Sequence, residues 1–460
     1  MTPLHGPETP SKTETWGMLK SASLQQRMPY LQNKPAVSID RPNIARERKP
    51  LSRVRLIRRA VLLIFLDPIP DECQRLFRLT GKEWHRLFYW LDVSGLALYL
   101  LDRLVELGLH DRLPPAVVDR LRKNTIDNEK RTQSMVKESI AIQREFQRAG
   151  HSYAVLKGLS LCPNAVPRPE LRHQFDLDFL VSEKSIFDAS KTLQSRGYRL
   201  YAISGKSWEF RVNEVPHGSL KDMYKPSPEQ AVELHVEPED SGDSSRLSRV
   251  IYREVSGILM PVLSPVDLFL GHALHAFKDV SSPFSRASHL LEFYRHIASR
   301  RDDPAFWLEL RCNPAVNRKA CLGIGVVTYL LTSIMGDFAP RELTDWTVQI
   351  LPPSVRLWVD VYGHRIVFGK PPGTKLHLLL KKELENAGLP GKHSLRKILL
   401  PLRLPLPVIR ATANETLSTR IARYRLQCRV ILSRLLFHLR EGTCYFWESF
   451  RWRQLLERLP

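Results

Sequence analysis

The chain has 460 residues, of which 43% are hydrophobic and 25% are charged. This composition is typical of a soluble globular protein and leaves room for two or three domains with a sizeable core. Its six cysteines include no C-x-x-C pair, which excludes a zinc ribbon or a disulfide framework and favours a reducing compartment. The sequence contains neither an N-terminal apolar segment nor a run of eighteen apolar residues, so we expect a cytoplasmic protein without a transmembrane segment.

The net charge of +21 is concentrated at the two ends of the chain. Residues 1–60 carry a net charge of +8 and residues 391–460 carry +10, so the middle of the chain is nearly neutral. A nucleic acid or another phosphate-rich partner would explain these basic ends, and so would an Arg-rich composition in solvated tails. Both explanations stay open, and the sequence gives no indication of the oligomeric state.

The first 150 residues divide into a tail and a helical region. Residues 1–50 mix Pro, Ser, Thr, Lys and Arg without periodicity, so we expect a disordered basic tail. Residues 51–150 are predicted to form a helical N-terminal region, in which apolar residues recur with a period near 3.6. The expected helices cover 82–91, 94–107 and 116–150. Gly150 fits the C-terminal cap of the last of them.

Residues 151–261 are predicted to form a central α/β unit. Short stretches with alternating or β-branched and aromatic residues indicate strands. They lie at 153–156, 175–181, 198–203, 208–212 and 231–236. A helix is expected over residues 185–195, and Gly197 lies just beyond its end.

The pattern is helical again beyond residue 261. Residues 262–340 are predicted to be a helical region that opens with a strong start signal, since Ser264 can cap a helix whose first residue is Pro265. Residues 341–460 are predicted to be a basic helical C-terminal region.

An amphipathic helix is expected within this C-terminal region, at residues 418–440. Its apolar stripe consists of Ile421, Tyr424, Cys428, Ile431, Leu435 and Leu439. Because most amphipathic helices in a chain of this size face their own core, we expect the stripe to pack inside the protein. The alternative is that it lies on an anionic membrane surface.

Two acidic residues stand on one face of the strand predicted at 175–181. The alternation of a strand places Asp176 and Asp178 on the same side, while Leu177 and Phe179 point to the other side. Paired carboxylates repel each other unless a cation lies between them, and oxygen ligands suit Mg²⁺ or Mn²⁺. A solvated strand face would produce the same pattern without a metal.

Lys157 and Gly158 follow the strand predicted at 153–156. A basic residue and a glycine between a strand and a helix can offer a cation and backbone N–H groups to a phosphate. The alternative is an ordinary surface lysine at the end of a strand. Further along the chain, Glu233, His235 and Glu237 share one face of the strand predicted at 231–236.

These motifs occur in a characteristic order along the chain. The ordered set consists of Leu156-Lys157-Gly158, Arg172, Asp176-Leu177-Asp178-Phe179-Leu180-Val181, Val232-Glu233-Leu234-His235 and the helix from Leu268 to His275. This order resembles the nucleotidyltransferase superfamily of DNA polymerase β, and more closely a bacterial branch called the uncharacterised nucleotidyltransferases. The resemblance covers residues 55–340. It implies an α+β fold in which a small mixed-sheet nucleotidyltransferase core is flanked by helical segments.

The resemblance also implies a reaction. An enzyme of this kind moves a nucleoside monophosphate from an NTP, such as ATP, to an acceptor and uses two divalent ions. Asp176 and Asp178 would bind both metals, and Glu233 would hold the acceptor-side metal or serve as a base. Lys157 and Gly158 would contact the triphosphate. One departure affects this phosphate site, because the wider superfamily carries Gly-Ser where this chain has Lys157-Gly158.

The resemblance leaves several roles open. Glu237 is an alternative to Glu233 as the third carboxylate. His235 would either orient a metal-bound carboxylate, bind the acceptor or serve a structural purpose. Arg172 would either neutralise a phosphate or pair with Asp176 or Glu170. The acceptor can be a small molecule, a peptide, a protein side chain or an RNA end.

Two other functions compete with this enzyme. One is a nucleotidyltransferase-like domain that has lost catalysis and serves as a scaffold. The other is a nucleic-acid-binding protein that acts through its basic ends.

Four residues further along could form a separate metal cluster. These are His272, His275, His289 and Glu292, which occur in pairs three residues apart. Their spacing matches no zinc signature, and the family resemblance implies that they pack beneath the active site instead. The stretch 369–375 resembles a P-loop, but its spacing is wrong and its two prolines lack N–H donors, so we expect an ordinary loop.

Overall fold

The computed structural model describes residues 51–212, 223–226, 230–239, 242, 245–255, 258–391, 399 and 415–459. All of them belong to one compact unit, Arg41–Pro460. The predicted disordered tail, residues 1–50, lies outside the described residues.

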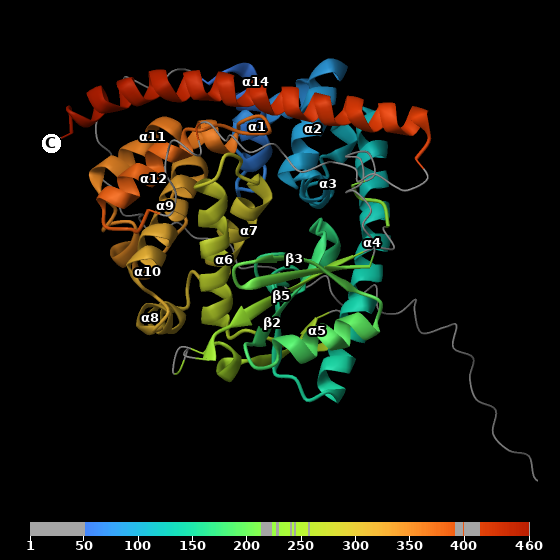
Figure 1. Cartoon of the computed structure of the whole chain (residues 1–460). Helices are drawn as coiled ribbons and strands as arrows, with labels where there is room; N and C mark the ends of the chain where they lie inside the picture. Colours follow the sequence, from blue (N-terminus) through green and yellow to red (C-terminus); the bar gives the residue numbers. More distant parts are fainter. Residues whose placement is uncertain are drawn as a thin grey trace, which may run out of the picture. The chain divides into compact units, whose positions relative to one another are not determined.

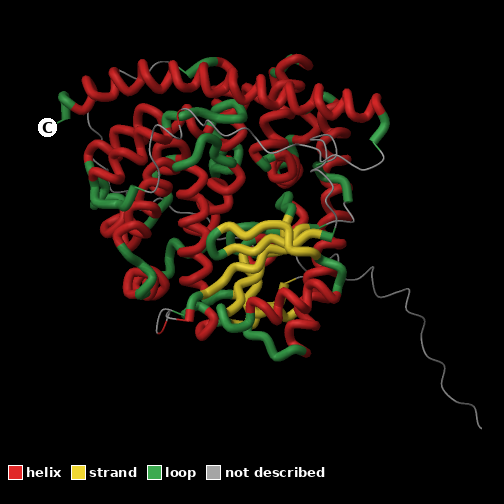
Figure 2. The backbone as a smooth tube through the Cα atoms, viewed as in Figure 1, coloured by secondary structure: helices red, strands yellow, loops and turns green. Residues whose placement is uncertain are grey.

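A seven-stranded sheet forms the centre of this unit, in the order β3-β4-β5-β2-β1-β7-β6 (Figure 1, Figure 2). Its strands are β1 (Tyr153–Leu156), β2 (Asp176–Ser182), β3 (Arg199–Ser204), β4 (Ser207–Arg211), β5 (Ala231–Glu237), β6 (Ile251–Val255) and β7 (Ile258–Val262). Strand β2 pairs antiparallel with β1 and parallel with β5, and β1 also pairs parallel with β7. The predicted α+β class with a mixed sheet is therefore confirmed, whereas the hairpin of β6 and β7 was not predicted.

Helices form the N-terminal part of the described chain. They are α1 (Arg53–Leu63), α2 (Gly81–Ser94), α3 (Ala97–Glu106) and α4 (Pro115–Arg148), with short 3₁₀ helices at Asp71–Arg78 and His110–Arg112. Helix α2 begins with a capping box, since Thr80 accepts from the Glu83 N–H and Glu83 accepts from the Thr80 N–H. Gly95 ends it with a φ of 76°. The helices predicted at 82–91, 94–107 and 116–150 are thus present.

Helices α4 and α5 (Ile186–Ser195) cover one face of the sheet. The ring of Phe179 on β2 is fully buried and lies edge-on to Phe146 of α4, with 5.6 Å between the ring centroids. Since side chains alternate along a strand, Asp176 and Asp178 lie on the opposite face. The apolar packing of one face therefore presents both carboxylates on the other.

A second group of helices follows the sheet. It comprises α6 (Pro265–Val280), α7 (Ala287–Ala298), α8 (Pro304–Cys312), α9 (Arg318–Met335), α10 (Arg341–Thr347), α11 (Pro353–Val367), α12 (His377–Asn386) and α14 (Leu417–Leu456). Ser264 caps α6 as predicted, by accepting from the Asp267 N–H. Among the described residues, α9 alone is long and apolar enough to cross a membrane, but 78% of it is buried inside the structure. Because it packs on α6, α10 and α11, α9 is a core helix.

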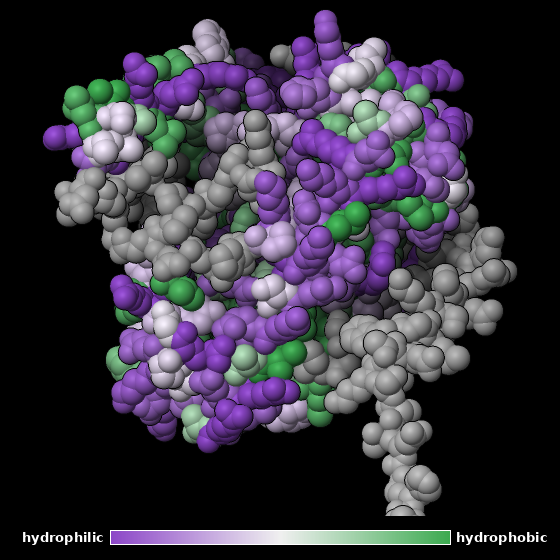
Figure 3. Space-filling model, turned by 90° about the vertical axis from the view of Figure 1, so that its right-hand side faces the viewer, coloured by the Kyte–Doolittle hydropathy of each residue, from purple (hydrophilic) through white to green (hydrophobic). Residues whose placement is uncertain are grey.

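The predicted packing of the C-terminal amphipathic helix is wrong. Tyr424 and Leu439 of α14 are 52% and 57% exposed, and Ile421 and Leu435 are also exposed. The helix packs through a different face near its C-terminal end, where Trp452 is buried. The exposed apolar side chains of α14 differ from the face of the molecule seen in Figure 3. That face is mostly hydrophilic, and its apolar side chains form small separate groups.

The contact between Phe179 and Phe146 predicts a specific loss of stability. Phe179→Ala should lower the free energy of unfolding by about 3–5 kcal/mol, because it leaves a cavity between the sheet and α4. Urea unfolding monitored by circular dichroism measures this change. Phe446→Ala, at a side chain that is 69% exposed, is the matched control and should change stability little. Equal losses in the two variants would contradict the packing described above.

Candidate functional site

Three neighbouring strands bring the predicted site residues together. In the sheet register, Asp178 of β2 lies opposite Leu156 of β1 on one side and opposite Glu233 of β5 on the other. Lys157 follows Leu156 directly, at the end of β1. Residues that are 76 positions apart in the sequence therefore become neighbours through strand pairing.

Lys157 contacts the carboxylates directly. Its Nζ donates a hydrogen bond to Asp178 Oδ1 over 2.7 Å and lies 4.0 Å from Glu233 Oε2. Burial would lower the pKa of Lys157, but the negative charge of Asp178 outweighs burial and raises it. Lys157 is therefore charged and belongs to the group of charges around Asp178.

His235 joins the same group of charges. Its Nε2 lies 2.8 Å from Asp178 Oδ1 and 3.3 Å from Glu233 Oε2. Burial would lower the pKa of His235, but its hydrogen bonds with both carboxylates raise it. Glu233 also accepts a hydrogen bond from Ser207 Oγ on β4, over 3.2 Å. The predicted proximity of His235 and Glu233 is thus present, and Ser207 is an addition that the sequence did not indicate.

Asp176 and Asp178 have different electrostatic surroundings. Burial and the negative charge of Asp178 raise the pKa of Asp176 to about 6. Burial would also raise the pKa of Asp178, but the hydrogen bond from His235 and the charge of Lys157 outweigh it and lower that pKa. The protein therefore compensates the charge of Asp178 well and the charge of Asp176 only in part.

These groups fit a divalent cation. Ligand atoms of Asp178, Glu233 and His235 lie within 4.8 Å of one another. Asp176 lies on the same face of β2, and its pKa is raised by burial and by the negative charge of Asp178, both of which a bound cation would offset. A site with three carboxylates suits Mg²⁺ or Mn²⁺. The Lys157 ammonium already neutralises part of the negative charge of these carboxylates.

The turn after β1 has an unusual backbone. Lys157 has a φ of 46° and is the only non-glycine residue with a positive φ in the described part of the chain. Such a conformation is sparsely populated and is often found at functional sites. Gly158 has a φ of 34°, and a Cβ at this position would lie 2.1 Å from Gln174 Oε1. The backbone conformation therefore favours glycine here, and a larger residue would have to displace the end of the Gln174 side chain.

Arg172 pairs with a residue that the sequence did not suggest. Its Nε donates to both carboxylate oxygens of Glu292 on α7, over 3.2 and 3.3 Å. Glu292 also accepts a hydrogen bond from the Tyr99 hydroxyl on α3, over 3.0 Å. Of the two alternatives for Arg172, the pairing with Asp176 or Glu170 is replaced by this buried link between the segment before β2 and two helices.

Glu237 belongs to a separate structural contact. Its carboxylate accepts from the N–H groups of Arg246 and Leu247 and from Ser245 Oγ. These three bonds fix the loop after β5, and the side chain is only 5% exposed. Glu237 is therefore wrong as an alternative third carboxylate, and Glu233 is the one that lies beside Asp178.

The possible second cluster divides: His272 and Glu292 have other partners, whereas ligand atoms of His275, His289 and Asp279 lie within 4.8 Å of one another and could hold a metal ion. His272 pairs with His296, with 3.1 Å between their Nδ1 atoms, and Glu292 binds Arg172. His289 and His275 lie together, with ring centroids 4.8 Å apart, and His289 Nδ1 lies 2.6 Å from Asp279 Oδ2. Burial lowers the pKa of His275 to about 3, so this histidine is neutral.

Comparisons with known proteins identify one family to which this chain is similar. A family model described as "uncharacterised nucleotidyltransferase" matches residues 80–329. A solved structure, the antigenic nucleotidyltransferase-like protein from Paracoccidioides brasiliensis, is similar with 14% identity and a TM-score of 0.29. The match covers 46% of this chain and 94% of that protein. A search of curated proteins gives no match.

The incomplete compensation of Asp176 predicts a pH-dependent gain in stability when its charge is removed. Folding raises the pKa of this carboxyl from 3.8 to about 6, so the stability it contributes at low pH is lost as the pH rises through 6. Asp176→Asn should therefore unfold with a free energy about 2–3 kcal/mol higher than the native chain at pH 8. At pH 4, below the folded pKa, the difference should be small.

Urea unfolding in EDTA, at pH 4 and pH 8, measures this difference in the metal-free protein. Asp302→Asn, at an exposed aspartate, is the matched control and should leave stability unchanged at both values. If Asp176→Asn is no more stable than the native chain at pH 8, the charge of Asp176 does not destabilise the metal-free protein as proposed.

Proposed function

This chain belongs to the family of uncharacterised nucleotidyltransferases, and from that premise we propose that it transfers a nucleoside monophosphate from an NTP to an acceptor. Pyrophosphate is the second product. The observation that supports this reaction is the cluster on β2 and β5, where Asp178 and Glu233 lie side by side with Lys157 Nζ against them. Phosphoryl chemistry needs such convergent charges, because its catalysis is mainly positioning and electrostatic stabilisation.

In this proposal three carboxylates hold the divalent ions. Asp176 and Asp178 lie on one face of β2, and Glu233 lies beside Asp178. Mg²⁺ or Mn²⁺ bound here would neutralise the charge of the phosphates and lower the pKa of the acceptor's attacking group. The hydrogen bond from His235 lowers the pKa of Glu233, so this residue is suited to hold a cation rather than a proton.

Lys157 and Gly158 form the phosphate side of the site. Lys157 carries its charge on a compact ammonium group that can exchange the Asp178 carboxylate for a phosphate oxygen. Gly158 has a φ of 34°, which favours glycine, and without a side chain its backbone can approach a bound phosphate closely. His235 retains its contact with Asp178 when Lys157 leaves, and so keeps that carboxylate oriented.

Arg172 has a positioning role in this account. Its guanidinium is held by Glu292, and only 12% of its side chain is exposed, so direct contact with a phosphate would break a buried ion pair. Burial and the charge of Asp178 raise the pKa of Asp176, and the positive charge of Arg172 offsets only a small part of that rise. We therefore assign Arg172 to ordering of the segment before β2.

The position of a radioactive label tests the reaction class. With cell extract as the source of acceptors, the protein should transfer ³²P from the α position of an NTP, and label from the γ position should appear in pyrophosphate. All four NTPs belong in the assay. Transfer of the γ label instead would indicate a kinase-like reaction. Mg²⁺-dependent NTP binding without any transfer would indicate a domain that has lost catalysis.

Variants of neighbouring carboxylates test the assigned site. Asp178→Asn and Glu233→Gln should each reduce transfer of the α label by at least about a hundredfold, because each removes a metal ligand. Glu209→Gln is the matched control. Glu209 lies directly opposite Glu233 in the sheet register, but its carboxylate binds Arg211 over 2.7 Å. Equal losses in Glu209→Gln and Glu233→Gln would show that the sheet, and not the site, was damaged.

Lys157→Ala tests the phosphate contact separately. One charge-assisted contact contributes about 1.5–3 kcal/mol, so the KM for NTP should rise about 10- to 150-fold. Steady-state kinetics with the preferred NTP measure this change, and Lys191→Ala, at an exposed lysine on α5, is the control. An unchanged KM together with an unchanged kcat would remove Lys157 from the substrate site.

A further inference from the structure

Helix α14 is the longest helix in the described part of the chain. It has 40 residues, from Leu417 to Leu456, and so extends for about 60 Å. Its side chains include eight arginines and only two acidic residues, Glu441 and Glu448. In Figure 1 the helix runs across the helical end of the described unit, on the far side from β2 and α5.

One face of α14 is fixed to the protein near the C-terminal end. Glu448 accepts a hydrogen bond from the Tyr362 hydroxyl over 3.1 Å and forms an ion pair with Arg365. Trp452 is buried and donates from Nε1 to Glu383 over 3.0 Å. Leu455 is buried on the same face. These contacts determine which side of the helix faces inward.

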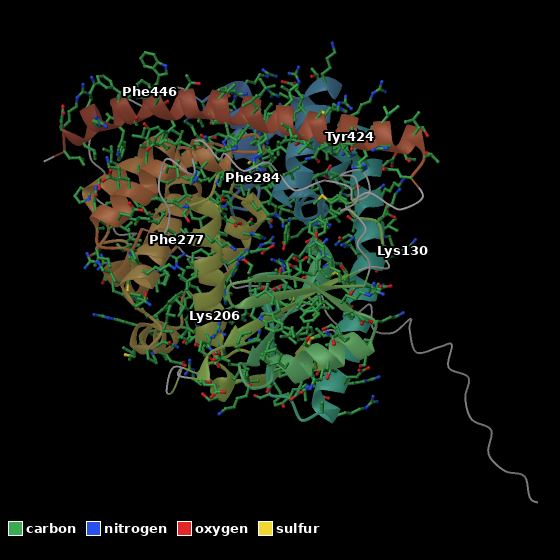
Figure 4. All side chains as sticks on the ribbon, viewed as in Figure 1. Lys130, Lys206, Phe277, Phe284, Tyr424 and Phe446 are labelled. Atoms are coloured by element: carbon green, nitrogen blue, oxygen red, sulfur yellow. The ribbon has the colours of Figure 1, made fainter. Side chains whose placement is uncertain are left out.

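The opposite face carries bulky apolar side chains along almost the whole helix. At 100° per residue these positions fall on one side, away from the inward contacts. This outer stripe consists of Leu417, Ile421, Tyr424, Leu432, Leu435, Leu436, Leu439, Phe446, Trp447 and Phe450. Figure 4 labels Tyr424 and Phe446 near its two ends. Leu417 and Trp447 are 73% and 70% exposed.

A continuous exposed stripe of this kind is unusual for a protein surface. Single exposed apolar residues are common, but large contiguous patches mark sites of interaction with proteins or membranes. The stripe extends over 34 residues, which corresponds to about 50 Å of helix. An interaction partner must therefore present an extended apolar surface.

The charges around the outer stripe have one sign. Five exposed arginines lie on α14, namely Arg420, Arg425, Arg429, Arg440 and Arg453. Both glutamates of the helix are turned toward the protein, where Glu448 binds Arg365 and Glu441 is only 11% exposed. The outer side of α14 is thus apolar and cationic, and its partner should be apolar and anionic.

We propose that α14 binds an anionic lipid bilayer through the outer stripe and lies in the plane of the membrane surface. An interfacial helix has these features: Leu, Phe and Trp on one face, basic residues beside them and few acidic residues exposed. Anionic head groups satisfy the arginines, while the acyl boundary covers the apolar side chains. The inward contacts of Trp452 and Glu448 hold the protein on the other side of the helix.

Two other partners satisfy these observations less well. A nucleic acid would satisfy the arginines but would leave the ten apolar side chains of the stripe without apolar surface to cover them. A second copy of the chain could cover the stripe through a symmetric contact. That contact would bring the exposed arginines of the two copies together, and their like charges would repel.

Vesicle flotation of the full-length protein tests this proposal. Vesicles of phosphatidylcholine with about 30 mol% phosphatidylglycerol supply the anionic surface, and vesicles of pure phosphatidylcholine supply the neutral one. We expect at least about tenfold more protein to float with the anionic vesicles, and we expect high salt to reduce the bound fraction. Equal flotation with both kinds of vesicle, or none with either, would overturn the proposal.

Variants of the stripe identify the surface that binds. Phe446→Ser with Trp447→Ser should reduce flotation by about tenfold or more, because it removes two bulky apolar side chains from the interface. The matched control is Leu308→Ser with Ile350→Ser, at apolar residues that are 64% and 48% exposed outside α14. Circular dichroism checks that both double variants remain folded.

The comparison between the two double variants decides the assignment. Loss of flotation only in the α14 variant supports the outer stripe. Unchanged flotation in the α14 variant, or equal loss in both variants, contradicts it. If light scattering shows a dimer that the α14 variant abolishes while the native chain does not float, the stripe is an interface between copies and the membrane proposal is wrong.

Discussion

Electrostatic repulsion among Asp176, Asp178 and Glu233 is the constraint on which the rest of the site depends. Strand pairing fixes Asp178 beside Glu233, and the alternation of β2 puts Asp176 on the same face. Like charges so close together are costly unless positive groups compensate them. Lys157 and His235 do so for Asp178, while Asp176 retains a pKa raised to about 6. This imbalance supports the proposed binding of a divalent cation.

Two sets of contacts hold the strand that carries these carboxylates in position. On one side, apolar packing of β2 against α4 and α5 prevents the carboxylate face from turning inward. On the other, the ion pair of Arg172 with Glu292 ties the segment before β2 to α7, and Tyr99 extends this link to α3. The positive φ of Lys157 is maintained between these supports. Local strain of this kind persists only where the surrounding structure enforces it.

Much of this arrangement could be predicted from the sequence, because it depends on local patterns. The alternation at Asp176–Ser182 revealed which carboxylates share a face, and the position of Lys157 after an apolar stretch revealed the turn. Pairing between distant residues left no such signal. Arg172 and Glu292 are 120 residues apart, and their neighbours in the sequence do not indicate the contact. Strand β7 contains Pro261, and proline is rare within strands, so its sequence does not indicate one.

The prediction that the apolar face of α14 packs inward was wrong for a different reason. Periodicity shows that a helix has an apolar face, but it does not show which face meets the protein. Here a polar and aromatic contact through Glu448 and Trp452 fixes the helix, and the apolar face is left exposed. The usual assumption that apolar faces turn inward therefore gave the wrong result. Such an exception is itself informative, since an exposed apolar face indicates interaction with a partner.

Anomalous X-ray diffraction from crystals containing Mn²⁺ and a non-hydrolysable NTP analogue tests the central claim most directly. The account predicts Mn²⁺ density among the carboxylates of Asp176, Asp178 and Glu233, with Lys157 Nζ moved from Asp178 to a phosphate oxygen. Mn²⁺ bound instead at His275, Asp279 and His289, with Lys157 still on Asp178, would contradict it.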